Sequence, residues 1–200
     1  MHPRPWPAVC LLLIAASALV GWLGSGGALA PDALVWQRDD WPHAPWTWWT
    51  APLWHRVAAH ALANSLALGA LAVLGAALGA RPRDALALLL AWPLGTLALA
   101  LAPEVGTYYG LSGTVHAAAA VLALRALRGP EARALGLLLG GGLLIKLALE
   151  RGWAVPIAFD SGWGFNVVHA AHLSGALAGV AMGALTEGLA RLADRRPAQS

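Results

Sequence analysis

The sequence predicts an all-α, polytopic membrane protein, built as one domain over residues 1–200 with six transmembrane helices. Of the 200 residues, 58% are hydrophobic and only 12% are charged, whereas soluble domains carry about 25% charged residues. Apolar runs recur along the chain, each about long enough to cross a ~30 Å hydrocarbon core as a helix. The six runs lie near residues 8–30, 57–80, 84–102, 112–128, 134–150 and 166–190.

The first apolar run has two possible interpretations. Arg4, the apolar stretch and the small residues 28–30 before Pro31 imitate a cleavable signal peptide. The length of the run favours a retained helix, and its removal would leave five spans with the chain ends on opposite sides. Cys10, in this run, is the single cysteine, which excludes an intramolecular disulfide.

The charged residues predict the orientation of the bundle. Arginines gather on one side of the six-span arrangement, and the positive-inside rule makes that side cytoplasmic. Both termini are then cytoplasmic, and we expect a bacterial inner membrane protein. The basic charge reports topology, so the lipid bilayer is an expected partner and nucleic acid is not. The arginines are Arg4, Arg81, Arg83, Arg125, Arg128, Arg133, Arg191, Arg195 and Arg196.

A few polar side chains lie inside the apolar runs, where lipid makes them costly and function usually explains them. In this topology they lie in the outer halves of their helices, which predicts a water-accessible cavity open to the outer face. Lys146 lies near the outer end of its run and is expected to snorkel to the headgroups. The set is His60, Asn64, Ser112, His116, Lys146, Asn166, His169 and His172.

Ser112 stands between Gly110 and Gly113 where the fourth run begins. Small neighbours leave its hydroxyl accessible, and a helix N-terminus offers free N–H groups that can stabilise an oxyanion. The pattern is typical of a nucleophile, but a serine that only caps the helix would look the same. His116 lies four residues later on the same face.

His172 lies at the edge of a glycine stripe in the sixth run. Gly175, Gly179 and Gly183 repeat every fourth residue, which lets membrane helices pack closely. Close packing would hold His172 against a neighbouring helix, as a general base must be held against its nucleophile. No carboxylate falls in the runs near His172, so we expect a dyad whose imidazole is oriented by packing and other hydrogen bonds.

These motifs together resemble the rhomboid family of intramembrane serine proteases. The matching elements are His60-x-x-x-Asn64, Gly110-Leu-Ser112-Gly113 and His172-x-x-Gly175, on the second, fourth and sixth runs. Within the superfamily the chain is most similar to the rhombosortases, whose serine motif GLSGxxHG matches residues 110–117 except at Ala117. Residues 35–39 and 46–50 resemble their outer-loop elements, although Thr47 stands where an arginine commonly follows the tryptophan.

The resemblance implies a role for each motif. Ser112 would be the nucleophile and His172 the general base. The Ser112 N–H would bind the oxyanion with the side chains of His60 and Asn64, and Gly175 would permit the close helix approach. His116 occupies the position of an aromatic residue that stacks on the catalytic histidine, so it either supports the site or only packs. His169 receives no role, and His55 is either interfacial or structural.

The resemblance also implies a substrate class and no metal or cofactor. Substrates would be membrane-anchored exported proteins that end in a glycine-glycine motif, a hydrophobic helix and a basic tail, cleaved near the outer face. Three alternatives stay open: a general rhomboid protease with other transmembrane substrates, a catalytically inactive rhomboid-like binding protein, and a metal or haem protein. The last would use His60, His116, His169 and His172 as ligands.

Overall fold

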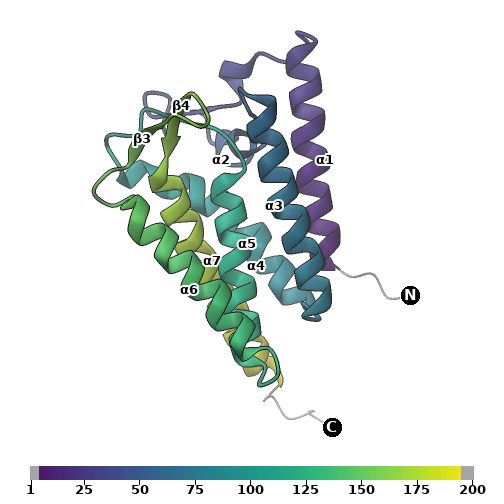
Figure 1. Cartoon of the computed structure of the whole chain (residues 1–200). Helices are drawn as coiled ribbons and strands as arrows, with labels where there is room; N and C mark the ends of the chain where they lie inside the picture. The colour runs from purple at the N-terminus through teal and green to yellow at the C-terminus, as the bar shows by residue number, and fades with distance from the viewer. Residues whose placement is uncertain (1–4, 195–200) are drawn as a thin grey trace.

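The computed structural model describes residues 5–194 and shows a bundle of long helices (Figure 1). The first five helices overlap the predicted apolar runs, although α1 ends at Ser25 instead of near 30 and α4 ends at Leu97 instead of near 102. The last helix begins at His169 instead of near 166. Residues 1–4 and 195–200, which include Arg4, Arg195 and Arg196 of the predicted cytoplasmic arginines, lie outside the described residues. The helices are α1 (Pro5–Ser25), α3 (Ala58–Ala77), α4 (Pro82–Leu97), α5 (Ser112–Arg128), α6 (Arg133–Glu150) and α7 (His169–Asp194).

Four helices within residues 5–194 are long and apolar enough to cross a membrane: α1, α3, α7, and α4 together with the 3-10 turn η3 (Ala98–Leu101). The two other long helices, α5 and α6, are not among these four. Helix α5 has 17 residues, of which ten are buried inside the bundle. Because those side chains face protein and not lipid, they need not be strongly hydrophobic. Six spans therefore stay a prediction, while an integral membrane protein is supported.

The glycine stripe of α7 packs directly against α5. A Cβ added at Gly175 would lie 2.0 Å from the carbonyl oxygen of Gly113, and one at Gly179 would lie 2.4 Å from that of Ala117. These neighbours are backbone atoms, which cannot swing aside as a side chain can. The two helices are thus in backbone contact at the ends that carry Ser112 and His172.

Helix α1 packs on α3 through a buried tryptophan. The indole N–H of Trp6 donates to the Leu71 carbonyl at 2.9 Å, and its ring is fully buried. Gly75 makes room for it, because a Cβ there would lie 2.1 Å from the ring. The indole therefore satisfies its polar atom while filling the core, as buried tryptophans usually do.

Short elements replace the loops that were predicted between the helices. Between α1 and α3 lie η1 (Pro31–Ala33), β1 (Trp36–Gln37), α2 (Thr47–Thr50) and η2 (Ala51–Leu53), and β1 pairs antiparallel with β2 (Thr107–Tyr108). A hairpin of β3 (Ile157–Asp160) and β4 (Phe165–Val168) precedes α7. Asn166 lies in β4, so its placement in the sixth helix was wrong. The aromatic and β-branched residues around it favour a strand.

The guanidinium of Arg38 ties β1 to the end of α4. It donates to backbone carbonyls of the 3-10 turn η3 that follows α4 and of the loop beyond it, where carbonyls lack intrahelical partners. The acceptors are Leu99 at 2.9 Å, Val105 at 3.0 Å, Ala100 at 3.3 Å and Ala102.

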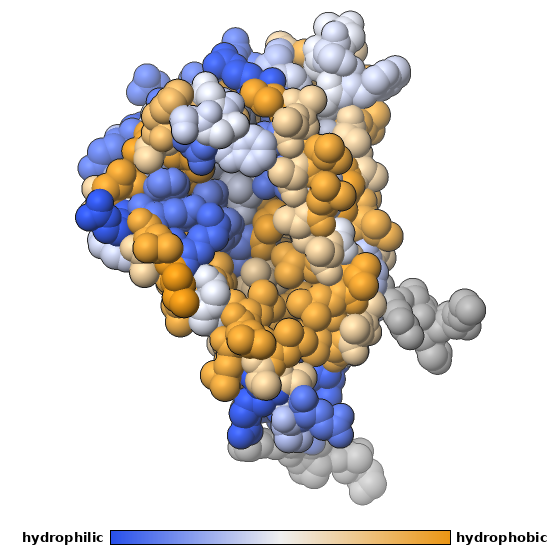
Figure 2. Space-filling view, viewed as in Figure 1, coloured by the Kyte–Doolittle hydropathy of each residue, from blue (hydrophilic) through white to orange (hydrophobic). Residues whose placement is uncertain are grey.

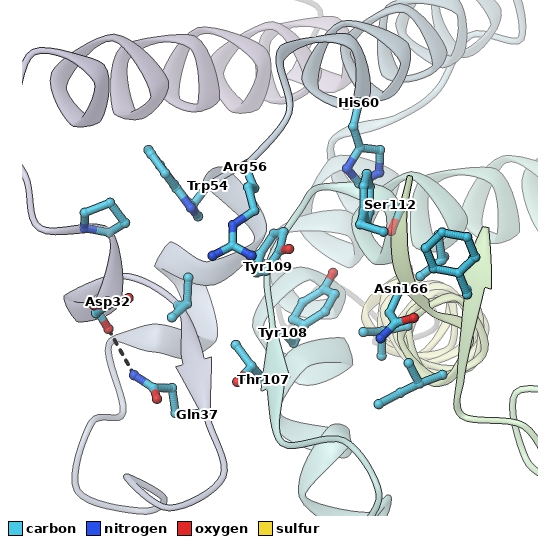
Figure 3. Close-up of a pocket in the computed structure, with 17 residues that line it drawn as sticks. Asp32, Gln37, Trp54, Arg56, His60, Thr107, Tyr108, Tyr109, Ser112 and Asn166 are labelled. Carbon is cyan, nitrogen blue, oxygen red and sulfur yellow. Dashed lines mark hydrogen bonds between the residues drawn. The ribbon is translucent and has the colours of Figure 1, made fainter. Parts of the chain in front are cut away.

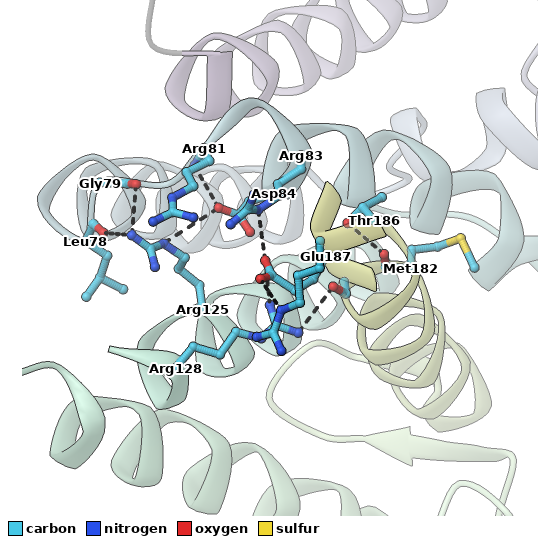
Figure 4. Close-up of polar contacts among 12 residues, drawn as sticks. Leu78, Gly79, Arg81, Arg83, Asp84, Arg125, Arg128, Met182, Thr186 and Glu187 are labelled. Atoms are coloured by element: carbon cyan, nitrogen blue, oxygen red, sulfur yellow. Dashed lines mark hydrogen bonds and ion pairs between the residues drawn. The ribbon is translucent and has the colours of Figure 1, made fainter. Parts of the chain in front are cut away.

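The end of the bundle away from the hairpin carries Arg81, Arg83, Arg125 and Arg128, which were expected to be cytoplasmic (Figures 1 and 4). Oε2 of Glu187 in α7 forms ion pairs with Nε of Arg83 in α4 at 2.8 Å and with Nη1 of Arg128 in α5 at 3.8 Å. Figure 2 shows hydrophobic residues over the middle of the bundle, with hydrophilic ones at this end and around a hollow near the hairpin. The molecule thus has an apolar band between two polar ends, as a membrane protein requires.

Candidate active site

Ser112 is the first residue of α5 and lines a cavity of about 810 Å³ (Figure 3). Gly110, two residues earlier, has a φ of +105°, a conformation that residues with a side chain rarely adopt. The Tyr108 hydroxyl donates to the Gly110 carbonyl at 2.6 Å, and burial raises the pKa of Tyr108, so this phenol stays protonated. The first N–H groups of a helix have no acceptor within that helix. The Ser112 hydroxyl therefore lies beside backbone N–H groups that can donate to another molecule.

His55 is the centre of a hydrogen-bond network that joins three parts of the chain. The Leu111 N–H donates to His55 Nε2 at 3.2 Å, so Nε2 is the acceptor and Nδ1 carries the hydrogen. Nδ1 lies 3.2 Å from the Ser17 hydroxyl of α1, which in turn donates to the Leu53 carbonyl at 2.8 Å. Burial, and then the neighbouring His60, lower the pKa of His55 to about 4. The network therefore contains a neutral imidazole.

Asn64 links His55 to His60. Its amide nitrogen lies 3.0 Å from His55 Nε2 and 3.1 Å from His60 Nε2. Since His55 Nε2 already acts as an acceptor, the Asn64 amide donates one hydrogen to each ring, and the hydrogen of His60 is on Nδ1. That nitrogen is buried without a partner in residues 5–194. A buried, unpaired N–H costs about 1–3 kcal/mol, and an incoming anionic oxygen would satisfy it.

The β3–β4 hairpin covers this side of the cavity. The His60 ring lies 5.1 Å from the Phe165 ring and 5.3 Å from the Trp163 ring, measured between centroids. Asn166 lines the same cavity from β4. Two aromatic side chains and one amide from the hairpin therefore lie beside the residues of α3 and α5.

His172 is buried on α7 and stacks on His116. Their ring centroids are 4.2 Å apart and the planes differ by 10°. His116 Nδ1 donates to the Ser112 carbonyl at 2.7 Å, which fixes the ring on the turn that begins with the serine. Within the described chain no hydrogen bond joins the Ser112 hydroxyl to His172; the two residues are related through His116 and through the Gly113–Gly175 contact.

A carboxylate lies against His172, contrary to the expectation from sequence. Glu150, the last residue of α6, places Oε2 2.8 Å from His172 Nδ1. Its other oxygen bonds Lys146 one turn earlier, so the lysine pairs with an acid as well as being half exposed. The i, i+4 spacing of Lys146 and Glu150 was the signal that these two side chains pair.

The same cluster offers ligands for a metal ion. His116, Glu150 and His172 each have a ligand atom within 4.8 Å of the others. The four-histidine set proposed from sequence is not assembled, because His169 Nδ1 bonds the Glu150 carbonyl at 3.1 Å and His60 stands among the hairpin aromatics. The expectation that the site uses no metal stays a prediction.

A family model described as Rhomboid domain matches residues 42–188. The chain belongs to the rhomboid family. Rhomboid proteins are generally serine intramembrane peptidases that act on transmembrane substrates within the bilayer. The match covers the network from His55 to Asn64, Ser112, Glu150 and His172, and leaves α1 outside. No curated protein matches the chain.

Proposed function

We propose that this rhomboid is an active serine endopeptidase in which Ser112 is the nucleophile and His172 the general base. The observation that supports it most is the surroundings of Ser112. The residue begins a helix at a cavity that it shares with His60, whose buried N–H has no partner among the residues that the structure describes. A serine that only capped a helix would need neither the unpaired donor nor the neighbouring histidine stack.

The chemistry follows from these positions. The proton of the Ser112 hydroxyl moves to His172 Nε2 while Oγ bonds the substrate carbonyl carbon, and the carbonyl oxygen becomes an anion. The Ser112 N–H and His60 Nδ1–H stabilise that anion. His172 then gives its proton to the leaving amine nitrogen, and water hydrolyses the acyl-enzyme by the same steps. Asn64 acts by holding His60, since both of its amide hydrogens are already donated.

For the substrate, we infer exported bacterial proteins with a C-terminal glycine-glycine motif, hydrophobic helix and basic tail. The support is the rhombosortase-like serine motif at residues 110–117. A peptide bond in a membrane helix must leave its hydrogen bonds before it can be attacked, and glycines weaken the helix there. Cleavage would occur at the outer face of the inner membrane, with both chain ends of the protease in the cytoplasm.

The test is cleavage of such a tail by purified protein in liposomes. Wild type is expected to release the exported part, and Ser112→Ala is expected to release none. Ser25→Ala is the matched control, because Ser25 is exposed and bonds only the Trp22 carbonyl of its own helix. Equal cleavage by wild type and Ser112→Ala would refute the assignment. Cleavage of other transmembrane proteins but not of this tail would favour the general protease.

The metal-binding alternative has an observation of its own in the His116–Glu150–His172 cluster. Metal analysis and labelling with a serine-reactive fluorophosphonate separate it from the protease. Labelling of Ser112 without stoichiometric metal supports the peptidase. Bound metal without labelling supports the alternative, and neither result would favour an inactive binding protein.

A further inference from the structure

We propose that Glu150 is a positioning residue for His172, so that the site operates as a Ser–His–Glu triad with its acid supplied by α6. This inference rests on the proposed peptidase function. The carboxylate oxygen lies 2.8 Å from His172 Nδ1, within the range of a charge-assisted hydrogen bond. The side chains of both residues are largely buried, at 14% and 6% exposed, so water competes weakly for either partner.

The carboxylate determines which imidazole nitrogen can act as the base. An ionised carboxylate only accepts hydrogen bonds, so His172 Nδ1 must carry the hydrogen and Nε2 keeps its lone pair. When Nε2 takes the Ser112 proton, the ring becomes a cation beside an anion. Glu150 keeps its charge throughout, and the proton leaves Nε2 for the amine of the departing peptide. The peptide and the water that hydrolyses the acyl-enzyme are the only reactants of this scheme.

Glu150 is itself held in place from three sides. Lys146 bonds its second oxygen, and the Glu150 carbonyl accepts from His169 Nδ1 at 3.1 Å. Gly152 lets the end of α6 approach α7, since a Cβ there would lie 2.6 Å from the His169 carbonyl oxygen. A residue that only needed solvent at a helix end would require none of these contacts. Support of this kind is what keeps a catalytic orientation within the required tolerance.

The ionisable groups beside the His172 ring come from α5, from α6 and from its own helix α7. Helix α5 contributes His116, α7 contributes His169, and α6 contributes Lys146 and Glu150. Within residues 5–194, Glu150 is the acid that bonds the ring. Its removal therefore leaves the imidazolium beside two histidines and a lysine, with no other acid bonded to the ring in the described part of the chain.

The test compares Glu150→Gln and Glu150→Asp with wild type in liposomes. Glu150→Gln keeps the shape and loses the charge, so we expect kcat to fall by about tenfold or more with KM unchanged. The acidic limb of its pH–rate profile should move to lower pH, because the imidazolium has lost its partner. Glu150→Asp keeps the negative charge on a side chain that is one methylene shorter. It should recover part of kcat, and the acidic limb of its pH–rate profile should lie where that of the wild type does. Glu104→Gln, an exposed acid outside the site, is the matched control.

Labelling with a fluorophosphonate separates failure of this inference from failure of the proposed function. If wild type is labelled at Ser112 and Glu150→Gln is labelled equally fast with an unchanged pH profile, the positioning role is wrong and the peptidase stands. If wild type is neither labelled nor active, both fail. A merely structural role predicts that Glu150→Gln and Glu150→Asp lose thermal stability together without any shift of the pH profile, which would also overturn the proposal.

Discussion

At the scale of single residues, the proton positions on three histidines are set by partners that only donate or only accept. His55 accepts from the Leu111 N–H, His60 accepts from Asn64, and His172 donates to Glu150. As a result the two rings that we propose to act in catalysis present opposite groups: an N–H on His60 and a lone pair on His172. The proposed reaction needs one of each.

The role of Asn64 can be separated from that of His60 by a double-mutant cycle. His60→Ala should lower kcat by about 10²–10³-fold, as loss of one oxyanion donor does. Asn64→Ala should also lower kcat, because the His60 hydrogen is no longer held on Nδ1. Since Asn64 acts through His60, the double variant should be no slower than His60→Ala alone, measured as cleavage rate. Fully additive losses would mean that Asn64 contacts the oxyanion itself.

His55 predicts a loss of stability in mild acid. The pKa of His55 in the folded state is lowered to about 4 from the ordinary 6.5. Between these two pH values, His55 is therefore protonated in the unfolded chain and neutral in the folded chain. The free energy of unfolding is therefore unaffected by protonation of His55 above about pH 6.5, and it decreases by on the order of 3 kcal/mol as the pH falls to 4. Thermal unfolding in detergent from pH 7 to 4 measures this. His55→Gln should flatten the slope, and an unchanged slope would contradict the prediction.

At the scale of elements, the α5–α7 contact depends on glycines, whose lack of a side chain lets the two backbones touch. Gly175→Ala would drive a Cβ into the Gly113 carbonyl, which is backbone and cannot move away alone. We expect a loss of about 1–3 kcal/mol or more in stability and a fall in activity as Ser112 and His172 separate. Gly142→Ala on α6 is the control, because no atom lies within 4 Å of its added Cβ. Thermal unfolding and cleavage rate are the measurements, and equal behaviour of the two variants would refute the packing argument.

The sequence predicted the elements whose signals are local. Apolar runs gave the long helices, and glycines around Ser112 and after His172 marked the helix ends that meet. Glu150 and His55 could not be assigned this way, because their partners lie 22 and 56 residues away in the chain. The β3–β4 hairpin was missed for a related reason: residues 157–168 are too few and too mixed to show a clear period. Long-range packing decides such contacts, and no local pattern reports it.

At the scale of the whole molecule, the arginine end predicts the orientation in the membrane. In a Cys10→Ser background, Glu131→Cys lies in the exposed turn between α5 and α6, at the arginine end, and Glu104→Cys is exposed near β2. A membrane-impermeant thiol reagent should label the cysteine at 104 from outside the inner membrane and the one at 131 only after permeabilisation. The reverse pattern would invert the proposed topology.

Helix α1 reaches the site although the family match does not include it. Trp6 anchors it to α3, and Ser17 meets His55. These contacts hold the helix in place without help from the exposed link at residues 26–30. Cleavage by signal peptidase and retention of the helix therefore need not exclude each other. A chain cut in that link would persist as two pieces that purify together, with the short one still completing the hydrogen bonds of the long one.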